Sequence, residues 1–385
     1  MRLRTHPMLS IATTLLLLQL PQPQREQEPF AVHPVATQHV ATSPDDQFVA
    51  IVANATAIRV DARTQTTEDL SDRGDVASVS LGNDHSYTLG LRDGRLVHVD
   101  QNGNRSEHLV HERRTVLGVQ QHEHLVAWWT VDSKAGVLDL KTGAQHFDPP
   151  LEVSIHLQYP AIRFAADGRF VACRVASKNQ EADTYAVVFE LATHNEVARL
   201  PCYASRGDAF AVAGLRILHA QRIDAKMWNL LAFDVESRQS KAIDGDLRGG
   251  HFVDLFASPS AKFVVEGDFE ETTLVRYTLD DDATAKLEFG EDSHPLGCGT
   301  LRQGGAEVEV VLVAMRKEPS QLAAFRLDDG SRVEVVLPTY GESPVAAAGT
   351  FASGLGFWSC HWVGTGGART RRIEFFALDA AAKRR

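Results

Sequence analysis

The sequence predicts an all-β repeat fold, and three observations support this prediction. A short phrase returns eight times: two or three apolar residues, a polar residue that is most often acidic, and a polar turn. Its acidic position is occupied by Asp61, Asp100, Asp139, Glu190, Asp234, Thr278, Arg326 and Ala377. Short apolar runs precede each copy, and Gly, Asn and Asp separate these runs. A period of about 45 residues along nearly the whole chain indicates a repeat architecture.

The second repeat gives the strand pattern most clearly. Its four runs cover residues 76–81, 86–91, 95–100 and 106–111, with polar turns between them. Runs of this length with apolar alternation and tight turns are typical of successive antiparallel strands. The sequence therefore predicts a single β-propeller of four-stranded antiparallel blades, with the acidic position at the end of each third strand. Because later copies replace the acid with Thr278, Arg326 and Ala377, we interpret this position as architectural rather than catalytic.

The spacing of the repeats favours eight blades, and seven is the alternative. Residues 29–385 divided by eight give about 45 residues per blade, which matches the observed period. The final repeat has three expected strands, near residues 343–351, 355–363 and 371–379, and then the chain stops. An unpaired edge strand would remain. We expect residues 29–35 to supply the missing strand, so that an N-terminal strand closes the last blade.

Three turns carry a resemblance to known families. The segments SPDDQFVA at 43–50, AADGRFVA at 165–172 and SPSAKFVV at 258–265 resemble the first turn of bacterial β-propeller repeats of the WD-repeat, YVTN and TolB-like families. The resemblance covers roughly residues 36–380 and implies the propeller architecture, but propellers host many functions. No copy contains the Trp-Asp dipeptide, so the side-chain network of WD repeats is not carried over.

The N-terminus indicates export. Residues 1–28 read as a signal peptide or short N-terminal anchor plus a proline-rich linker, and residues 29–385 as the propeller domain. Arg2 and Arg4 precede an apolar run from Met8 to Leu20, which suits the core of a signal peptide and is too short for a spanning helix. No small-residue cleavage pattern follows at the usual distance, so an uncleaved anchor stays open. The expected location is periplasmic, secreted or cell-surface.

Charge and cysteine usage narrow the partners and cofactors. The formal net charge of −11 and the pI of about 5.8 argue against nucleic acid, which basic surfaces bind. Four cysteines without a CxxC pair exclude a zinc ribbon. In an exported protein Cys173 and Cys202 are the best candidates for a disulfide, and buried free thiols are the alternative.

Histidines, tryptophans and acidic runs are the candidates for chemistry. His122 and His124 are expected on one side of a strand, either as metal ligands or, as we prefer, at a solvated strand end. For the tryptophans we prefer a core role over ligand stacking; they are Trp358 and Trp362 on one strand face, Trp128 and Trp129 on opposite faces, and Trp228. We interpret the acidic runs at 266–271, 280–282 and 244–246 as solvated loops rather than calcium sites.

No catalytic, cofactor-binding or metal-binding residue is assigned, and no cofactor is expected. The sequence lacks a GxSxG elbow, a phosphate loop of the GxxxxGK type and a GxGxxG motif. The predicted function is an exported binding or scaffold module whose partner is another protein or an envelope component. Loops 177–183, 315–320 and 363–369, each expected between a second and a third strand, should meet that partner on one face. The alternatives are a YVTN-like lactonase or lyase with a site at the central channel, and a purely structural ring.

Overall fold

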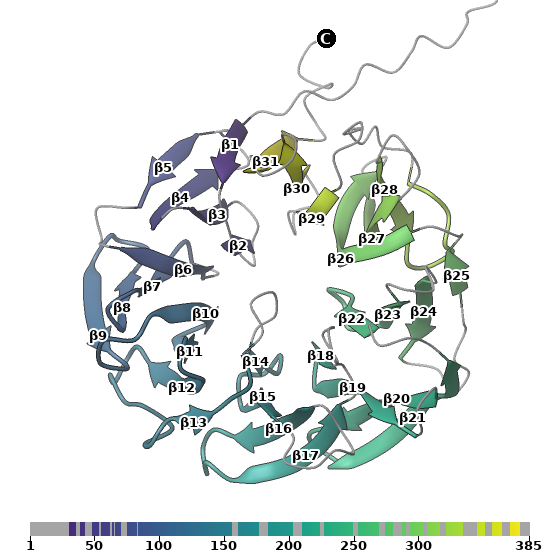
Figure 1. The fold of residues 1–385 in the computed structure, drawn as a ribbon, viewed down its shortest axis with the longest axis horizontal. Helices are drawn as coiled ribbons and strands as arrows, with labels where there is room; N and C mark the ends of the chain where they lie inside the picture. The colour runs from purple at the N-terminus through teal and green to yellow at the C-terminus, as the bar shows by residue number, and fades with distance from the viewer. Residues whose placement is uncertain are drawn as a thin grey trace, which may run out of the picture.

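The computed structural model arranges the strands as sheets that follow one another around a ring (Figure 1). The structure describes residues 31–35, 39–42, 48–53, 55–61, 64, 66–70, 75–82, 84–155, 161–176, 184–202, 210–223, 227–248, 253–268, 274–279, 287–289, 293–303, 306–315, 321–333, 345–350, 356–363 and 370–377. Within these residues the strands form eight antiparallel sheets, seven of four strands and one of three. The prediction of an all-β propeller is confirmed.

The first four sheets follow the chain order. They are β2 (His39–Thr42), β3 (Phe48–Ala53), β4 (Thr56–Asp61) and β5 (Thr67–Asp69); β6 (Val76–Leu81), β7 (Tyr87–Leu91), β8 (Arg95–Val99) and β9 (Arg105–Leu109); β10 (Val116–His122), β11 (Leu125–Thr130), β12 (Lys134–Asp139) and β13 (Leu151–Glu152); and β14 (Ile162–Phe164), β15 (Phe170–Ala176), β16 (Thr184–Glu190) and β17 (Glu196–Cys202).

The remaining sheets include the one of three strands. They are β18 (Phe210–Ala213), β19 (Arg216–Arg222), β20 (Met227–Asp234) and β21 (Gln239–Arg248); β22 (Val253–Ala257), β23 (Phe263–Asp268), β24 (Leu274–Thr278) and β25 (Leu287–Phe289); β26 (Ser293–Gln303), β27 (Ala306–Met315) and β28 (Gln321–Arg326); and β29 (Val345–Thr350), β30 (Gly356–Val363), β31 (Thr370–Ala377) and β1 (Ala31–Val35).

The last of these sheets joins the two ends of the chain. Strand β1 pairs antiparallel with β31, with Ala31 opposite Phe375 and Val35 opposite Arg371. In Figure 1 the two strands lie side by side next to the first repeat. The prediction that an N-terminal strand closes the last blade is confirmed, and the edge of β31 is paired as a closed ring requires.

The recurring acidic position lies where the third strand of each sheet ends, as predicted. Asp61, Asp139, Glu190, Asp234, Thr278, Arg326 and Ala377 are the last residues of their strands, and Asp100 follows β8 directly. Asp100 Oδ1 accepts the backbone N–H groups of Asn102 and Asn104, both at 2.8 Å. Asp234 Oδ1 accepts that of Ser237 at 2.8 Å. These bonds fix the turn into the fourth strand, which is the role that Asp commonly has in turns.

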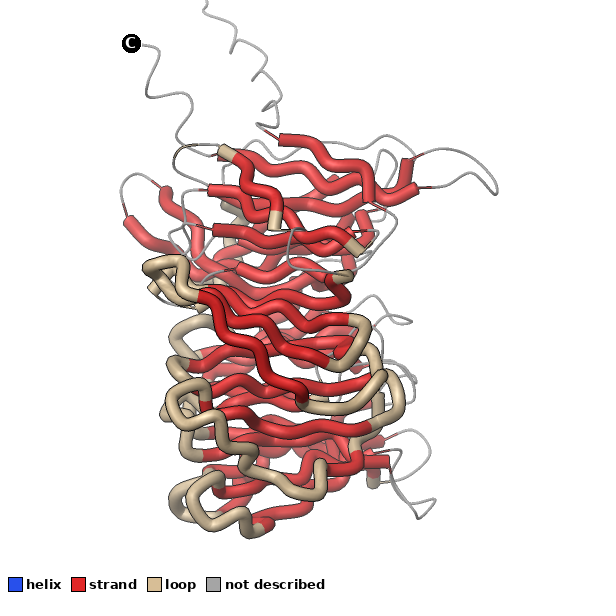
Figure 2. The backbone as a smooth tube through the Cα atoms, turned by 90° about the vertical axis from the view of Figure 1, so that its left-hand side faces the viewer, coloured by secondary structure: helices blue, strands red, loops and turns tan. Residues whose placement is uncertain are grey.

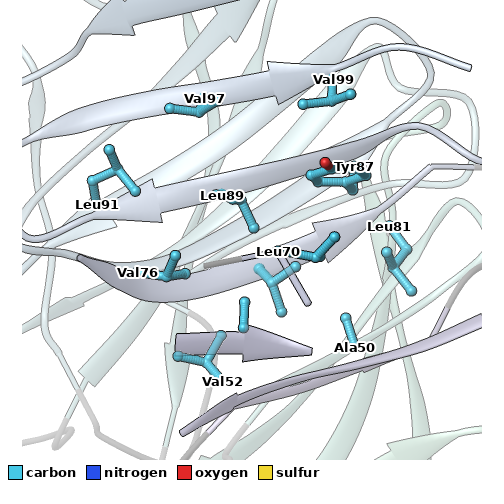
Figure 3. Close-up of a cluster of buried hydrophobic side chains, with 12 residues drawn as sticks. Ala50, Val52, Leu70, Val76, Leu81, Tyr87, Leu89, Leu91, Val97 and Val99 are labelled. Carbon is cyan, nitrogen blue, oxygen red and sulfur yellow. The ribbon is translucent and has the colours of Figure 1, made fainter. Parts of the chain in front are cut away.

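Apolar side chains from neighbouring sheets fill the seams between them. Figure 3 shows one such seam, where Ala50, Val52 and Leu70 of the first repeat pack against Val76 and Leu89 of the second. At other seams the large aromatic side chains of Trp128, Trp129 and Trp228 are buried. Their predicted core role is confirmed. Trp358 and Trp362 lie on β30, and their side chains are outside the described part.

The predicted disulfide is wrong. Cys173 and Cys202 are both buried and are not joined by a disulfide. Cys173 packs with Trp129 and Phe164 on one face of the β14–β17 sheet, whereas Cys202 packs with Phe210 on the other face. Alternation along the strands therefore separates the two sulfur atoms across the sheet. The alternative of buried thiols is the one that the structure bears out, and burial raises the pKa of Cys173 above its ordinary value.

The chain ends and several acidic runs fall outside the description. Residues 1–28, assigned to export, are not among the described residues. No helix of the described part is long and apolar enough to cross a membrane. Of the run 266–271, Glu266 is buried and accepts a hydrogen bond from the Tyr277 hydroxyl at 3.0 Å, so its expected solvated position is wrong. Residues 280–282 lie outside the described residues, and residues 244–246 lie within β21 rather than in a loop.

Candidate functional site

A pocket of about 520 Å³ lies between the β6–β9 and β10–β13 sheets. Its lining comes from turns and strand ends of both sheets and consists of Asp84, His98, Asp100, Gln121, Glu123, His124, Leu140 and Lys141. Asp84, Glu123 and His124 lie in turns between first and second strands, while Asp100, Leu140 and Lys141 follow third strands. In an antiparallel four-stranded sheet these two kinds of turn share one edge. The pocket is therefore on the face of the ring that carries them.

The three loops proposed from the sequence connect strands at the other edge. The β15–β16, β27–β28 and β30–β31 connections contain residues 177–183, 316–320 and 364–369, so their predicted place between second and third strands is confirmed. The loops themselves lie outside the described residues. Figure 2 shows the strands crossing the thickness of the disk, with the connections at its two faces. The pocket and the strand ends that these three loops connect consequently lie on opposite faces.

The side chain of Gln121 joins the two blades at the floor of the pocket. Its Nε2 donates to the Ser86 hydroxyl at 2.8 Å and to the Glu123 carbonyl at 3.1 Å. Its Oε1 accepts the hydroxyl of Thr88 at 3.0 Å. Its backbone N–H also donates to the Ser80 hydroxyl at 2.8 Å. Four bonds thus hold this residue, and three of them cross the seam.

These bonds settle the orientation of the amide and the tautomer of His98. A carbonyl oxygen only accepts, so the amide nitrogen of Gln121 faces the Glu123 carbonyl and its oxygen faces Thr88. Because Thr88 gives its proton to Gln121, its oxygen receives one from His98 Nδ1 at 3.0 Å. The neutral ring therefore carries its proton on Nδ1 and leaves Nε2 with a free lone pair. Burial lowers the pKa of His98, against the opposing effects of Asp84 and Asp100, and so favours this neutral form.

Three carboxylates give the lining its charge. Asp84 Oδ1 accepts the backbone N–H of Ser86 at 3.1 Å. Burial raises the pKa of Asp84, but the hydrogen bonds with Ser86 lower it, and together with smaller effects they leave the pKa below its ordinary value. This carboxyl is therefore ionised at neutral pH. Both carboxylate oxygens of Asp100 accept hydrogen bonds within the turn that follows β8, and the side chain of Glu123 is mostly exposed. Apart from its two imidazoles, the lining has three carboxylates against the single ammonium of Lys141, which leaves a net charge of −2.

The structure separates the two histidines that the sequence placed together. Strand β10 ends at His122, and Glu123 and His124 form a tight turn in which Glu123 has φ of 50°. His122 packs against Phe164, with ring centroids 5.4 Å apart, and lies over Gly168. His124 instead lines the pocket at the other seam. The expectation of a shared strand face is wrong because the turn interrupts the alternation. No group of three or more His, Cys, Asp or Glu fit to hold a metal is present among the described residues.

Comparisons with known proteins support the fold and give no information on the pocket. No protein-family model matches the chain, and no curated protein matches its sequence. Solved structures with a similar fold include the computationally designed Ika8 protein (TM-score 0.60, 14% identity, 92% of this chain and 99% of that one). They also include the Dos1 propeller (0.57, 12%, 90% and 95%) and BamB from Moraxella catarrhalis (0.55, 12%, 91% and 100%). At these identities the likeness establishes the β-propeller architecture alone.

From the sequence no binding residue was assigned. Two lining residues were noticed, Asp100 as a turn residue and His124 as a candidate metal ligand, but the pocket that joins them was not predicted. His98, Thr88 and Gln121 carry no motif, because each lies within an ordinary alternating strand. One signal was available. Asp84 and Glu123 occupy the same turn of two successive repeats, so acidic residues recur at one edge of neighbouring blades.

Proposed function

We propose that the protein is an exported β-propeller binding module that engages a partner protein through the face carrying the pocket. The observation that carries the proposal is the pocket itself, whose charged lining is held on a hydrogen-bonded floor shared by two blades. Rigid sheets that present polar groups on turns are the usual arrangement for recognition. A pocket of this volume is also within the range of ligand sites.

The enzyme reading has less support. A YVTN-like lactonase or lyase would gather titratable groups at the central channel. The pocket instead draws its lining from two neighbouring blades only. Gln121 lies on the first strand β10, but His98 is on a third strand and Leu140 and Lys141 follow another, so the site extends outward along one seam between blades. A binding role needs only the acceptors and charges that are present, and it is the function that this geometry favours.

Cross-linking tests the proposed face. A photo-reactive cross-linker would be placed at exposed Lys141 in the full chain, expressed in its own host, and the captured protein identified by mass spectrometry. We expect capture to be lost when Asp84 and Glu123 are both replaced by Ser. Capture should persist in a control in which residues 177–183 become Gly and Ser. The reverse pattern would overturn the proposal and move the partner to the opposite face.

We also propose export, on the basic start and apolar run of residues 1–20. Protein purified from its host should lack the N-terminal segment up to about residue 24, or retain it as an anchor in the membrane fraction, and should be accessible from outside the cytoplasm. N-terminal sequencing and protease protection decide this. An intact chain in the cytosolic fraction would contradict it.

We further propose that the ring has eight blades rather than the alternative of seven. This proposal counts each of the eight sheets as one blade. The sheet of three strands is extended by a single bridge between Phe325 and Arg332, where a fourth strand would begin. The WD-repeat, YVTN or TolB-like origin of these blades rests on the three turns alone. A crystal structure with seven blades would overturn the count.

A further inference from the structure

We propose that the pocket between the β6–β9 and β10–β13 sheets binds a basic side chain, lysine or arginine, presented by the partner protein. This inference rests on the proposed function and names the chemistry that the site recognises. It follows from which atoms donate and which accept in the hydrogen bonds at the floor of the pocket.

The floor is a polarised chain of hydrogen bonds that ends in an acceptor on each side. On one side His98 Nδ1 donates to Thr88, which donates to Gln121 Oε1. On the other side Gln121 Nε2 donates to the Ser86 hydroxyl, and the Ser86 side chain hydrogen-bonds Asp84. The Glu123 carbonyl can only accept, so it fixes which end of the Gln121 amide is the nitrogen. This orientation determines the donor and the acceptor in the hydrogen bonds on both sides. Both ends of this chain, His98 and Asp84, line the pocket.

A ligand that fits these ends is therefore a donor. The His98 ring offers the lone pair of Nε2, and Asp84 offers an ionised carboxylate. An ammonium or a guanidinium has several donors and no acceptor, and hydrogen bonds between such cations and carboxylates are the strong kind. An anion would face a lining of net charge −2, whose one cation, Lys141, is exposed.

The rest of the lining suits a long side chain with a charged tip. Leu140 gives an apolar wall for an aliphatic stem, and it is held by a backbone bond to the His124 carbonyl at 2.8 Å. The side chain of Glu123 is 70% exposed, so its carboxylate can contact an approaching cation. His124 Nδ1 is buried without a hydrogen-bond partner and lies 3.9 Å from that carboxylate, beyond hydrogen-bond length. This nitrogen is a further polar atom for a ligand to satisfy.

The test uses short peptides on the full chain. The probes are Ac-Gly-Gly-Lys-Gly-Gly-amide, its arginine counterpart and its acetyl-lysine counterpart, which keeps the stem and removes the charge. Binding would be followed by chemical-shift changes of the protein amides. We expect saturable binding of the lysine or arginine peptide, with shifts around the pocket, and at least tenfold weaker binding of the acetyl-lysine peptide. Equal binding of all three would overturn the proposal.

Matched variants locate the contact. Asp84→Asn should weaken binding of the basic peptide at least tenfold. Asp167→Asn is the control, because Asp167 occupies the same turn of the β14–β17 sheet and accepts the N–H of Arg169 at 3.0 Å in the same way. This variant should bind as the parent chain does. Parent-like binding by Asp84→Asn would overturn the assignment, and so would tight Zn²⁺ binding that excludes the peptide.

The two proposals fail in different ways. If the natural partner is captured through the pocket but no basic peptide binds, the face is right and the ligand class is wrong. If basic peptides bind in the pocket but partner capture is unchanged by the Asp84 and Glu123 replacements, the ligand class is right and the proposed partner face is wrong.

Discussion

The β10–β13 blade meets its two neighbours through seams of opposite character. Toward β14–β17, Trp129 lies over Gly118 and packs with Phe164 in an apolar cluster. Toward β6–β9, apolar packing gives way near the turns to the hydrogen-bonded side chain of Gln121. Gly118 and Gln121 both belong to β10 and face opposite seams, so a single blade provides both a packed joint and a polar site. Stability and recognition are thereby divided between its two faces.

The largest effect should come from the apolar seam. Trp129→Ala removes a buried indole and leaves a cavity between two blades, which costs about 3–5 kcal/mol of unfolding free energy. Denaturant unfolding of the full chain measures this loss. Trp129→Phe is the control and should cost less, because it keeps much of the ring. A loss for Trp129→Ala no greater than that of the polar variants below would break the contrast between the seams.

A smaller loss of stability, with a loss of binding, should follow at the polar seam. Gln121→Leu leaves the Thr88 hydroxyl and the Glu123 carbonyl without their partner, at a cost of about 1–3 kcal/mol. The neighbouring residue is a matched control. Gln120 faces the other seam, and its Oε1 is buried without a hydrogen-bond partner. Gln120→Leu should therefore be neutral or stabilising, and should leave peptide binding unchanged. Equal losses from the two variants would show that the network adds nothing specific.

The sequence could supply the fold but not this division of roles. The turn phrase at Asp100 and its equivalents depends on local bonds, so its spacing located the third strands, and the missing last strand pointed to β1. The disulfide failed because strand alternation put Cys173 and Cys202 on opposite faces. The His122 and His124 pair failed because a two-residue turn reversed the chain. The pocket depends on residues 33 to 41 positions apart, whose hydrogen bonds form only when the two blades pack.

Binding of the basic peptide should weaken in acid. Burial holds the pKa of His98 below the ordinary imidazole value of about 6.5. Above that value Nε2 is a free acceptor, and as pH falls through the lowered pKa the ring gains a proton and a positive charge. Asp84 and Asp100 have lowered pKa values, so they stay ionised in this range. The other titratable groups at the pocket or beside His98 are Glu123, His124, Lys141 and His108.

His98→Asn isolates this effect. It keeps a donor for Thr88 and removes the titrating ring, so its peptide binding should vary less between pH 7 and pH 5 than that of the parent chain. The sign for stability is the same: a lowered folded pKa means that the unfolded chain takes up the proton first, so stability falls as pH drops below about 6.5. Unchanged pH dependence in His98→Asn would assign the acid effect to another group.

The smallest effect should distinguish the architectural carboxylates from the binding one. Asp100 lines the pocket, but Oδ1 accepts two backbone N–H groups and Oδ2 accepts Asn104 Nδ2 at 2.8 Å, so it offers a ligand charge rather than a free oxygen. Asp100→Asn should weaken the basic peptide by about fivefold at most, as for an exposed charge. Asp234→Asn, at the same turn of a distant blade, should change nothing. A larger loss for Asp100→Asn than for Asp84→Asn would mean that the third-strand turn, and not the first, holds the cation.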